Sequence, residues 1–118
     1  MIVDLTFLAM RVRREVNDFA ILAPRPDQLG VPLPAAWFEE GLHHLRNALV
    51  DPYWAEPRYC WTESETPHAV VVVADDAEDY LLAFDPTPEG DFVLVYRRGG
   101  ELAITNIRGD AVGCFLSR

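Results

Sequence analysis

The stretch HAVVVVADDAEDYLLAFDP, from His68 to Pro86, decides the fold class of this chain. The run AVVVVA is apolar and rich in β-branched residues, which predicts a strand buried on both faces near the middle of a sheet. DYLLAFD predicts a second strand, so the acidic residues between the two strands form their connection. The stretch therefore predicts a strand pair whose turn displays the carboxylates of Asp75, Asp76, Glu78 and Asp79.

Further strands are predicted around this pair. DFVLVY and LAITNI predict two more strands, and RRGGE between them predicts a hairpin in which Gly99 and Gly100 adopt positive φ angles. RYCWT, from residue 58, is a short strand candidate. RGD, at residues 108–110, predicts a turn. The tail AVGCFLSR is compatible with a last strand or a short helix, and we favour the strand.

Two helices are predicted before the strands. Apolar residues at three- and four-residue steps predict a first helix with Asp4 as its N-cap. A second helix is predicted from about Pro34 to Val50, where Pro52 stops it. Helices followed by clustered strands predict one α+β domain over residues 1–118, with two N-terminal helices packed on an antiparallel meander of four to six strands.

The charge of the chain is strongly negative and unevenly placed. The net charge is −9 over 118 residues, and residues 51–118 contribute −8, from thirteen acids and five arginines. Such a chain is not expected to bind nucleic acid or an anionic membrane, but its field can steer a basic protein partner. The apolar N-terminus has no basic start and is interrupted by Asp4, so we expect a cytoplasmic protein, with Cys60 and Cys114 as buried thiols.

Three interpretations of the four acids remain open: a solvated turn, an acidic patch that faces a partner, or a metal site. A calcium loop of the EF-hand type needs ligands spread over twelve residues and a central glycine, and this run has neither. His43 and His44 are adjacent on the second helix, so they point in different directions and cannot share one metal ion. No phosphate-binding loop or serine nucleophile motif is present. We therefore expect no catalytic residue, metal or cofactor.

Six aromatic residues lie within about twenty-five positions of one another. They favour either a contact between helix and sheet or the lining of a pocket, since both environments suit large rings with a polar edge. They are Trp37, Phe38, Tyr53, Trp54, Tyr59 and Trp61.

Two segments carry a resemblance to a known family. LGVPLPAAWFEEGLHHL resembles the connector and aromatic helix of the SUKH superfamily of bacterial immunity proteins. VVADDAEDYLLAFDP resembles the strand pair F-A-D-D-x-x-G-D-x-Y-x-F-D of that family, although Glu78 stands where the family has glycine. The resemblance implies an α+β scaffold that binds and neutralises a toxin, often a nuclease, without catalysis.

The resulting hypothesis is a non-catalytic binding protein of the immunity type, which meets a basic partner through an acidic surface. The partner-binding residues are then Asp75, Asp76, Glu78 and Asp79, with Trp54 or Trp61 as an aromatic anchor. Two alternatives remain. One is a small-molecule-binding module or small enzyme with an aromatic-lined pocket between the second helix and the sheet. The other is a structural homodimer joined through an exposed edge strand, so a monomer and a homodimer are both open.

Overall fold

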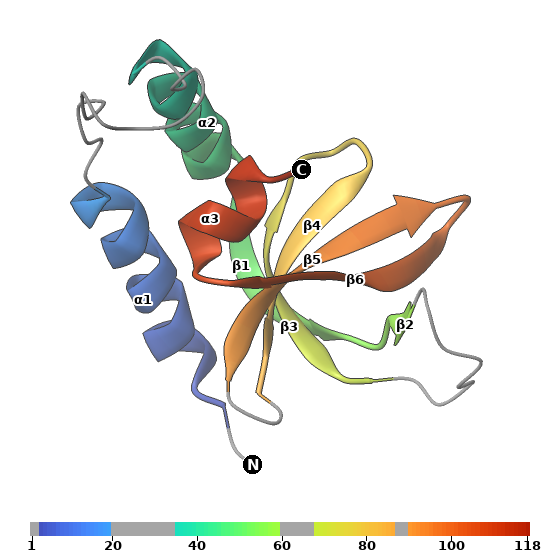
Figure 1. Cartoon of the computed structure of the whole chain (residues 1–118). Coiled ribbons are helices and arrows are strands. Elements are labelled where there is room, and N and C mark those ends of the chain that lie inside the picture. Colours follow the sequence, from blue (N-terminus) through green and yellow to red (C-terminus); the bar gives the residue numbers. More distant parts are fainter. Residues whose placement is uncertain (1–2, 20–34, 60–67, 87–89) are drawn as a thin grey trace.

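A computed structural model of the chain describes residues 3–19, 35–59, 68–86 and 90–118. Helices gather on one side of a strongly twisted sheet (Figure 1). Two helices come before the sheet in the chain, which confirms the predicted α+β class. In chain order the elements are α1 (Leu5–Asp18), α2 (Ala35–Ala48), β1 (Leu49–Ala55), β2 (Arg58–Tyr59), β3 (Val70–Asp75), β4 (Tyr80–Asp85), β5 (Asp91–Arg98), β6 (Glu101–Gly109) and α3 (Ala111–Leu116).

The sheet curls so far that its two edges approach each other. Its strand order is β1-β3-β4-β5-β6-β2, with an antiparallel meander from β1 to β6 and with β2 parallel to β6. The edge strands β1 and β2 are separated in the chain only by Glu56 and Pro57. In a flat sheet they would lie roughly 24 Å apart, at about 4.8 Å per strand. Three peptide units span at most about 11 Å. The sheet must therefore bend toward a partly closed barrel.

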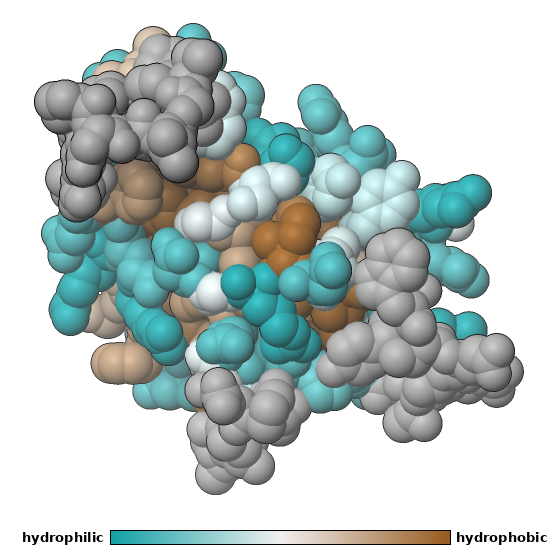
Figure 2. All heavy atoms as spheres, viewed as in Figure 1, coloured by the Kyte–Doolittle hydropathy of each residue, from teal (hydrophilic) through white to brown (hydrophobic). Residues whose placement is uncertain are grey.

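This curled sheet buries both of its faces. Val71 and Val73 point outward into the cluster that the helices cover, with Leu45 of α2 and Phe115 of α3. Figure 2 shows hydrophobic residues where the helices meet the sheet, surrounded by hydrophilic ones. Because side chains alternate along a strand, the residues between them point into the curl. The inner cluster consists of Val70, Val72, Leu81, Ala83, Val93, Val95 and Ile104, so AVVVVA is buried on both faces as predicted.

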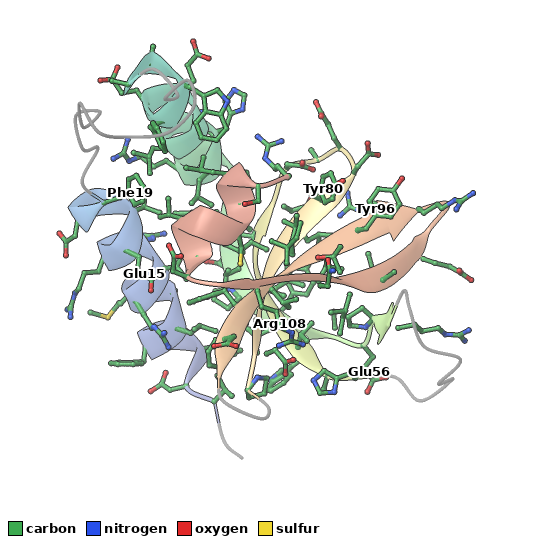
Figure 3. The ribbon with its side chains drawn as sticks, viewed as in Figure 1. Glu15, Phe19, Glu56, Tyr80, Tyr96 and Arg108 are labelled. Carbon is green, nitrogen blue, oxygen red and sulfur yellow. The ribbon has the colours of Figure 1, made fainter. Side chains whose placement is uncertain are left out.

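Charged groups border the inner cluster at both ends of the strands. At one end Asp85 is fully buried, and its carboxylate accepts a hydrogen bond from Arg108 at 2.7 Å and lies 2.7 Å from His68 Nε2. In Figure 3 Arg108 lies below the middle of the view, away from Tyr80 and Tyr96. At the other end Asp75 pairs with Arg97 at 2.7 Å. A buried carboxylate is costly unless it is paired and hydrogen-bonded, so these partners are what allow the sheet interior to end in charged residues.

Helices α1 and α3 begin at aspartate caps. The side chain of Asp4 accepts a hydrogen bond from the backbone N–H of Phe7 at 3.0 Å, which confirms the predicted N-cap of α1. Asp110 accepts one from the N–H of Gly113 at 3.0 Å and starts α3. The strand predicted for the tail AVGCFLSR is therefore wrong. A short apolar run fits either element, and here the cap and the burial of Val112 and Phe115, three residues apart, select the helix.

Strand β1 is the element that the sequence interpretation missed. The second helix ends at Ala48, and Leu49–Ala55 continues as an edge strand although Pro52 lies within it. Proline is compatible with an edge strand, because only one side of that strand must donate ladder hydrogen bonds. The predicted hairpin is confirmed, since Gly99 and Gly100 have φ angles of 56° and 86°.

Candidate functional site: an acidic turn beside a groove

The turn between β3 and β4 is built by two of its own carboxylates. One oxygen of Asp75 accepts a hydrogen bond from the N–H of Ala77 at 2.8 Å. One oxygen of Asp76 accepts from the N–H groups of Glu78 and Tyr80, at 2.8 and 3.1 Å. Aspartate favours turns for this reason, because its side chain bonds the backbone two residues further on. Asp75 and Asp76 therefore fix the conformation of the turn.

The same two aspartates are each paired with an arginine. The second oxygen of Asp75 lies 2.7 Å from Arg97, and the hydrogen bond from Arg97 holds the pKa of Asp75 below its ordinary value. The second oxygen of Asp76 lies 3.2 Å from Arg118, and only 6% of the Asp76 side chain is exposed. Both charges are thus compensated within the protein.

Glu78 and Asp79 remain as the outward-facing carboxylates of the turn. Both residues are exposed, and neither side chain takes part in an ion pair with the described residues. The backbone carbonyl of Asp79 accepts a hydrogen bond from the N–H of Arg97, which ties the turn to β5. Four carboxylates against Arg97 and Arg118 leave the turn with a charge of −2. This charge is displayed on a rigid turn.

Tyrosine rings lie next to the turn on the outer face of the sheet. Tyr80 on β4 and Tyr96 on β5 are cross-strand partners whose ring centroids are 5.4 Å apart. Figure 3 shows the two rings beyond the end of α3, and both residues are partly exposed. Cross-strand aromatic pairs stabilise a sheet, so this pair stabilises β4 and β5 next to the turn.

Arg118 connects the turn to the helices. One guanidinium nitrogen lies 3.2 Å from Asp76, and another lies 3.1 Å from His44 Nδ1 on α2. The guanidinium carbon also stacks over the ring of Phe115 on α3, at 4.3 Å from the centroid. Arg118 is therefore held by three elements, and no sequence signal linked it to Asp76, forty-two residues earlier.

Two adjoining clefts run along α2 beside this arginine. The first measures about 310 Å³ and the second about 230 Å³, and they share His44, Phe115 and Arg118. We call them together the α2 groove. Its other lining residues include Asn47, Asp75, Asp76 and Glu78 in the first cleft, and Trp37 and Glu40 in the second. The groove lies between the second helix and the turn of the sheet, close to where the alternative pocket hypothesis expected a cavity.

Of the two predicted tryptophan anchors, Trp54 does not lie in this groove. Trp54 is exposed on β1, where it lies opposite Val71 of β3. Val71 is four residues before Asp75, so at the usual strand rise roughly 13 Å separates this position from Asp75. Trp61 lies outside the described residues. Trp37 lines the groove instead, and 38% of it is exposed. Its ring is in edge-to-face contact with that of Phe38, with the ring centroids 5.0 Å apart. Trp37 is one of the six aromatics for which the sequence favoured either a contact between helix and sheet or the lining of a pocket.

Among the described residues we find no site for nucleophilic catalysis and none for binding a metal ion. Burial raises the pKa of the Cys114 thiol to about 11, so this free thiol stays protonated at neutral pH. The Ser117 hydroxyl donates a hydrogen bond to the backbone carbonyl of Gly113 at 2.7 Å, so it bonds the backbone at the end of α3. No group of three His, Cys, Asp or Glu side chains in the described ranges is placed to hold a metal ion. Cys60 lies outside these ranges.

Comparison with family models, curated proteins and solved structures finds no significant match to this chain. Within the part of the chain that the structure describes, no helix is long and apolar enough to cross a membrane.

Proposed function

We propose that the protein is a non-catalytic binding protein that holds a basic segment of another protein in the α2 groove. The observation that carries the proposal is the presence, in one groove, of the exposed Trp37 ring and the carboxylates of Glu40 and Glu78. The side chain of an arginine or lysine gains from both, because it pairs with carboxylates and stacks on the face of an indole ring.

The charge of the groove supports a cationic occupant. Four lining carboxylates, set against Arg118 and against the Arg97 that pairs with Asp75, give a formal charge of −2 when histidine is counted as neutral. The whole chain carries −9, so its field has the same sign as the groove. Complementary potentials of this kind raise the association rate and orient the partner, and salt weakens them.

The residues of the site take two different roles in this proposal. Asp75 and Asp76 hold the turn and are already paired with arginines, so they position the wall of the groove. Glu78, together with Asp79 on the same turn, is free to meet a partner cation. We assign the aromatic anchor to Trp37 rather than to Trp54, because Trp37 lines the groove.

An immunity role is the most specific form of this proposal. Toxins with nuclease activity present basic surfaces to nucleic acid, and a protein of net charge −9 complements them. The SUKH-like residues on β3, on β4 and in their turn support the same role, since Asp75 and Asp76 of that motif build one wall of the groove.

The experiment is affinity capture from the native cell with two matched double variants. Glu40→Gln with Glu78→Gln removes two charges from the groove, whereas Glu39→Gln with Glu101→Gln removes two exposed charges outside it. The wild type should capture a basic protein in a complex that salt dissociates. The groove variant should lose it, and the control variant should keep it.

Two results would count against the proposal. One is a captured partner that is not basic or that survives high salt, because the groove would then not act through charge. The other is equal loss in both double variants, because net charge alone would then explain the binding.

A further inference from the structure

A separate cavity lies on the other side of α2, where α1 packs beside the junction of α2 and β1. It measures about 280 Å³ and is lined by Arg13, Val16, Asn17, Arg46 and Leu49. None of these residues lines the α2 groove. The proposed partner-binding function leaves this cavity unexplained.

Polar groups reach this cavity from two helices. Arg13 and Asn17 are four residues apart on α1, so their side chains lie one turn apart on the same face. Arg46 belongs to the last turn of α2. Val16, which is almost fully buried, and Leu49 provide an apolar floor beneath them. The cavity therefore combines two guanidiniums and an amide above a hydrophobic surface.

The two guanidiniums have no carboxylate partner within the described ranges. Arg97 and Arg118 lie 2.7 and 3.2 Å from aspartates, whereas neither Arg13 nor Arg46 takes part in an ion pair or hydrogen bond there. Two like charges that line one cavity without a counter-charge create a site that favours an anion.

The ends of the helices reduce this positive charge without cancelling it. Both α1 and α2 end near the cavity, and each C-terminus carries roughly half a negative charge from its helix dipole. Two arginines thus leave roughly one net positive charge. Asp18 is adjacent to Asn17 but does not line the cavity, so it lowers the local potential only from outside.

We propose that this cavity binds a small phosphomonoester, with Arg13 and Arg46 on the phosphate and the body of the ligand on Val16 and Leu49. Arginine presents paired N–H donors that match phosphate oxygens, and two such forks suit a dianion. The amide of Asn17 supplies a further donor. The apolar floor favours a ligand with a hydrophobic or flat body over free phosphate.

The test is an NMR titration of the whole ¹⁵N-labelled chain with inorganic phosphate and with phenyl phosphate. Phenyl phosphate should bind saturably with a Kd of about 1 mM or tighter, shift the amides around Arg13, Asn17 and Arg46, and bind more tightly than inorganic phosphate. Arg13→Gln and Arg46→Gln should each weaken binding about tenfold or more, since each removes charged hydrogen bonds.

Arg14→Gln is the matched control. It removes the same charge from the next position of α1, and Arg14 is exposed and does not line the cavity, so this variant should bind like the wild type. Asp18→Asn should tighten binding modestly by removing a nearby negative charge. All four variants change exposed side chains, and their unfolding midpoints should match the wild type.

The proposal is overturned if neither compound saturates the protein. It is also overturned if Arg14→Gln weakens binding as much as Arg46→Gln, because a diffuse basic helix would then be the cause. Equal affinity for the two compounds would exclude the apolar floor as part of the site. None of these results depends on whether the α2 groove binds a protein.

Discussion

Replacing Asp85 by asparagine tests how much the buried carboxylate at one end of the curled sheet contributes to stability. The carboxylate is fully buried, and it meets Arg108 and His68 at 2.7 Å each. Asparagine keeps the size of the side chain but removes the charge and turns an amide N–H₂ toward one of two donors. The guanidinium of Arg108 then loses the charged partner that Asp85 provides.

The magnitude follows from burial. Removing one partner of a fully buried ion pair costs about 3–5 kcal/mol. Arg108 and His68 keep side-chain exposures of 29% and 26%, so water can reach them after the substitution. We therefore expect the free energy of unfolding to fall by about 2–3 kcal/mol. For a chain of this length roughly 1 kcal/mol corresponds to 4 °C, so the melting temperature should fall by roughly 8–12 °C.

Urea unfolding with a matched control measures this loss. Asp91→Asn alters the cross-strand neighbour of Asp85, a partly exposed aspartate, and should change stability by less than about 0.5 kcal/mol. A double-mutant cycle with Arg108→Gln should give a coupling energy above about 1 kcal/mol. A loss no larger than that of Asp91→Asn, or a coupling near zero, would refute the role of the buried pair.

Three further predictions each concern one side chain. Asp75→Asn should lower the free energy of unfolding by about 0.5–1 kcal/mol at neutral pH in urea titrations. The hydrogen bond from Arg97 depresses the folded pKa of Asp75 below 3.8, so its stabilisation is complete above that value and is lost as the pH falls through the folded pKa; a gap between wild type and variant that persists in strong acid would contradict this cause. Asp110→Ala should cost about 1 kcal/mol in the same assay by removing the cap of α3, and unchanged stability would show that the cap is dispensable. In a Cys60→Ser variant, Cys114 should react slowly with a disulfide reagent at neutral pH and quickly in urea, because burial raises its pKa to about 11; fast labelling of the folded chain would contradict that burial.

The fold was predictable where local and tertiary signals agree. The run AVVVVA has no polar residue on either side of the strand, which requires burial on both faces, and the curled sheet provides it. The glycine pair at 99 and 100 fixed the hairpin through its positive φ angles. Asp4 marked the start of α1 because a cap is a local hydrogen bond.

The missed elements depend on contacts distant in sequence. Leu49–Ala55 contains Pro52 and is a strand because it pairs with β3, a contact that no local pattern announces. The tail is helical because Asp110 caps it and the helices of the N-terminal half cover it. Apolar residues alone did not distinguish that helix from a strand.

The candidate site was predictable in part. The four acids do lie together at one turn, since they fall within five successive positions, 75–79. Their division into paired and exposed groups depends on Arg97 and Arg118, which approach from β5 and from the end of the chain. The groove itself exists only because α2, α3 and the turn converge, so Trp37 and Glu40 could not be connected with Glu78 before the fold was known.

We propose that the α2 groove captures a cationic segment through its own charges. The most direct measurement is the association rate of the captured partner with each double variant over a range of salt concentrations. Glu40→Gln with Glu78→Gln should lower the association rate at low salt about tenfold and flatten its salt dependence. The control variant Glu39→Gln with Glu101→Gln removes the same number of negative charges. It should keep most of the association rate and most of its salt dependence. Identical rates and salt slopes for the two double variants would contradict the claim.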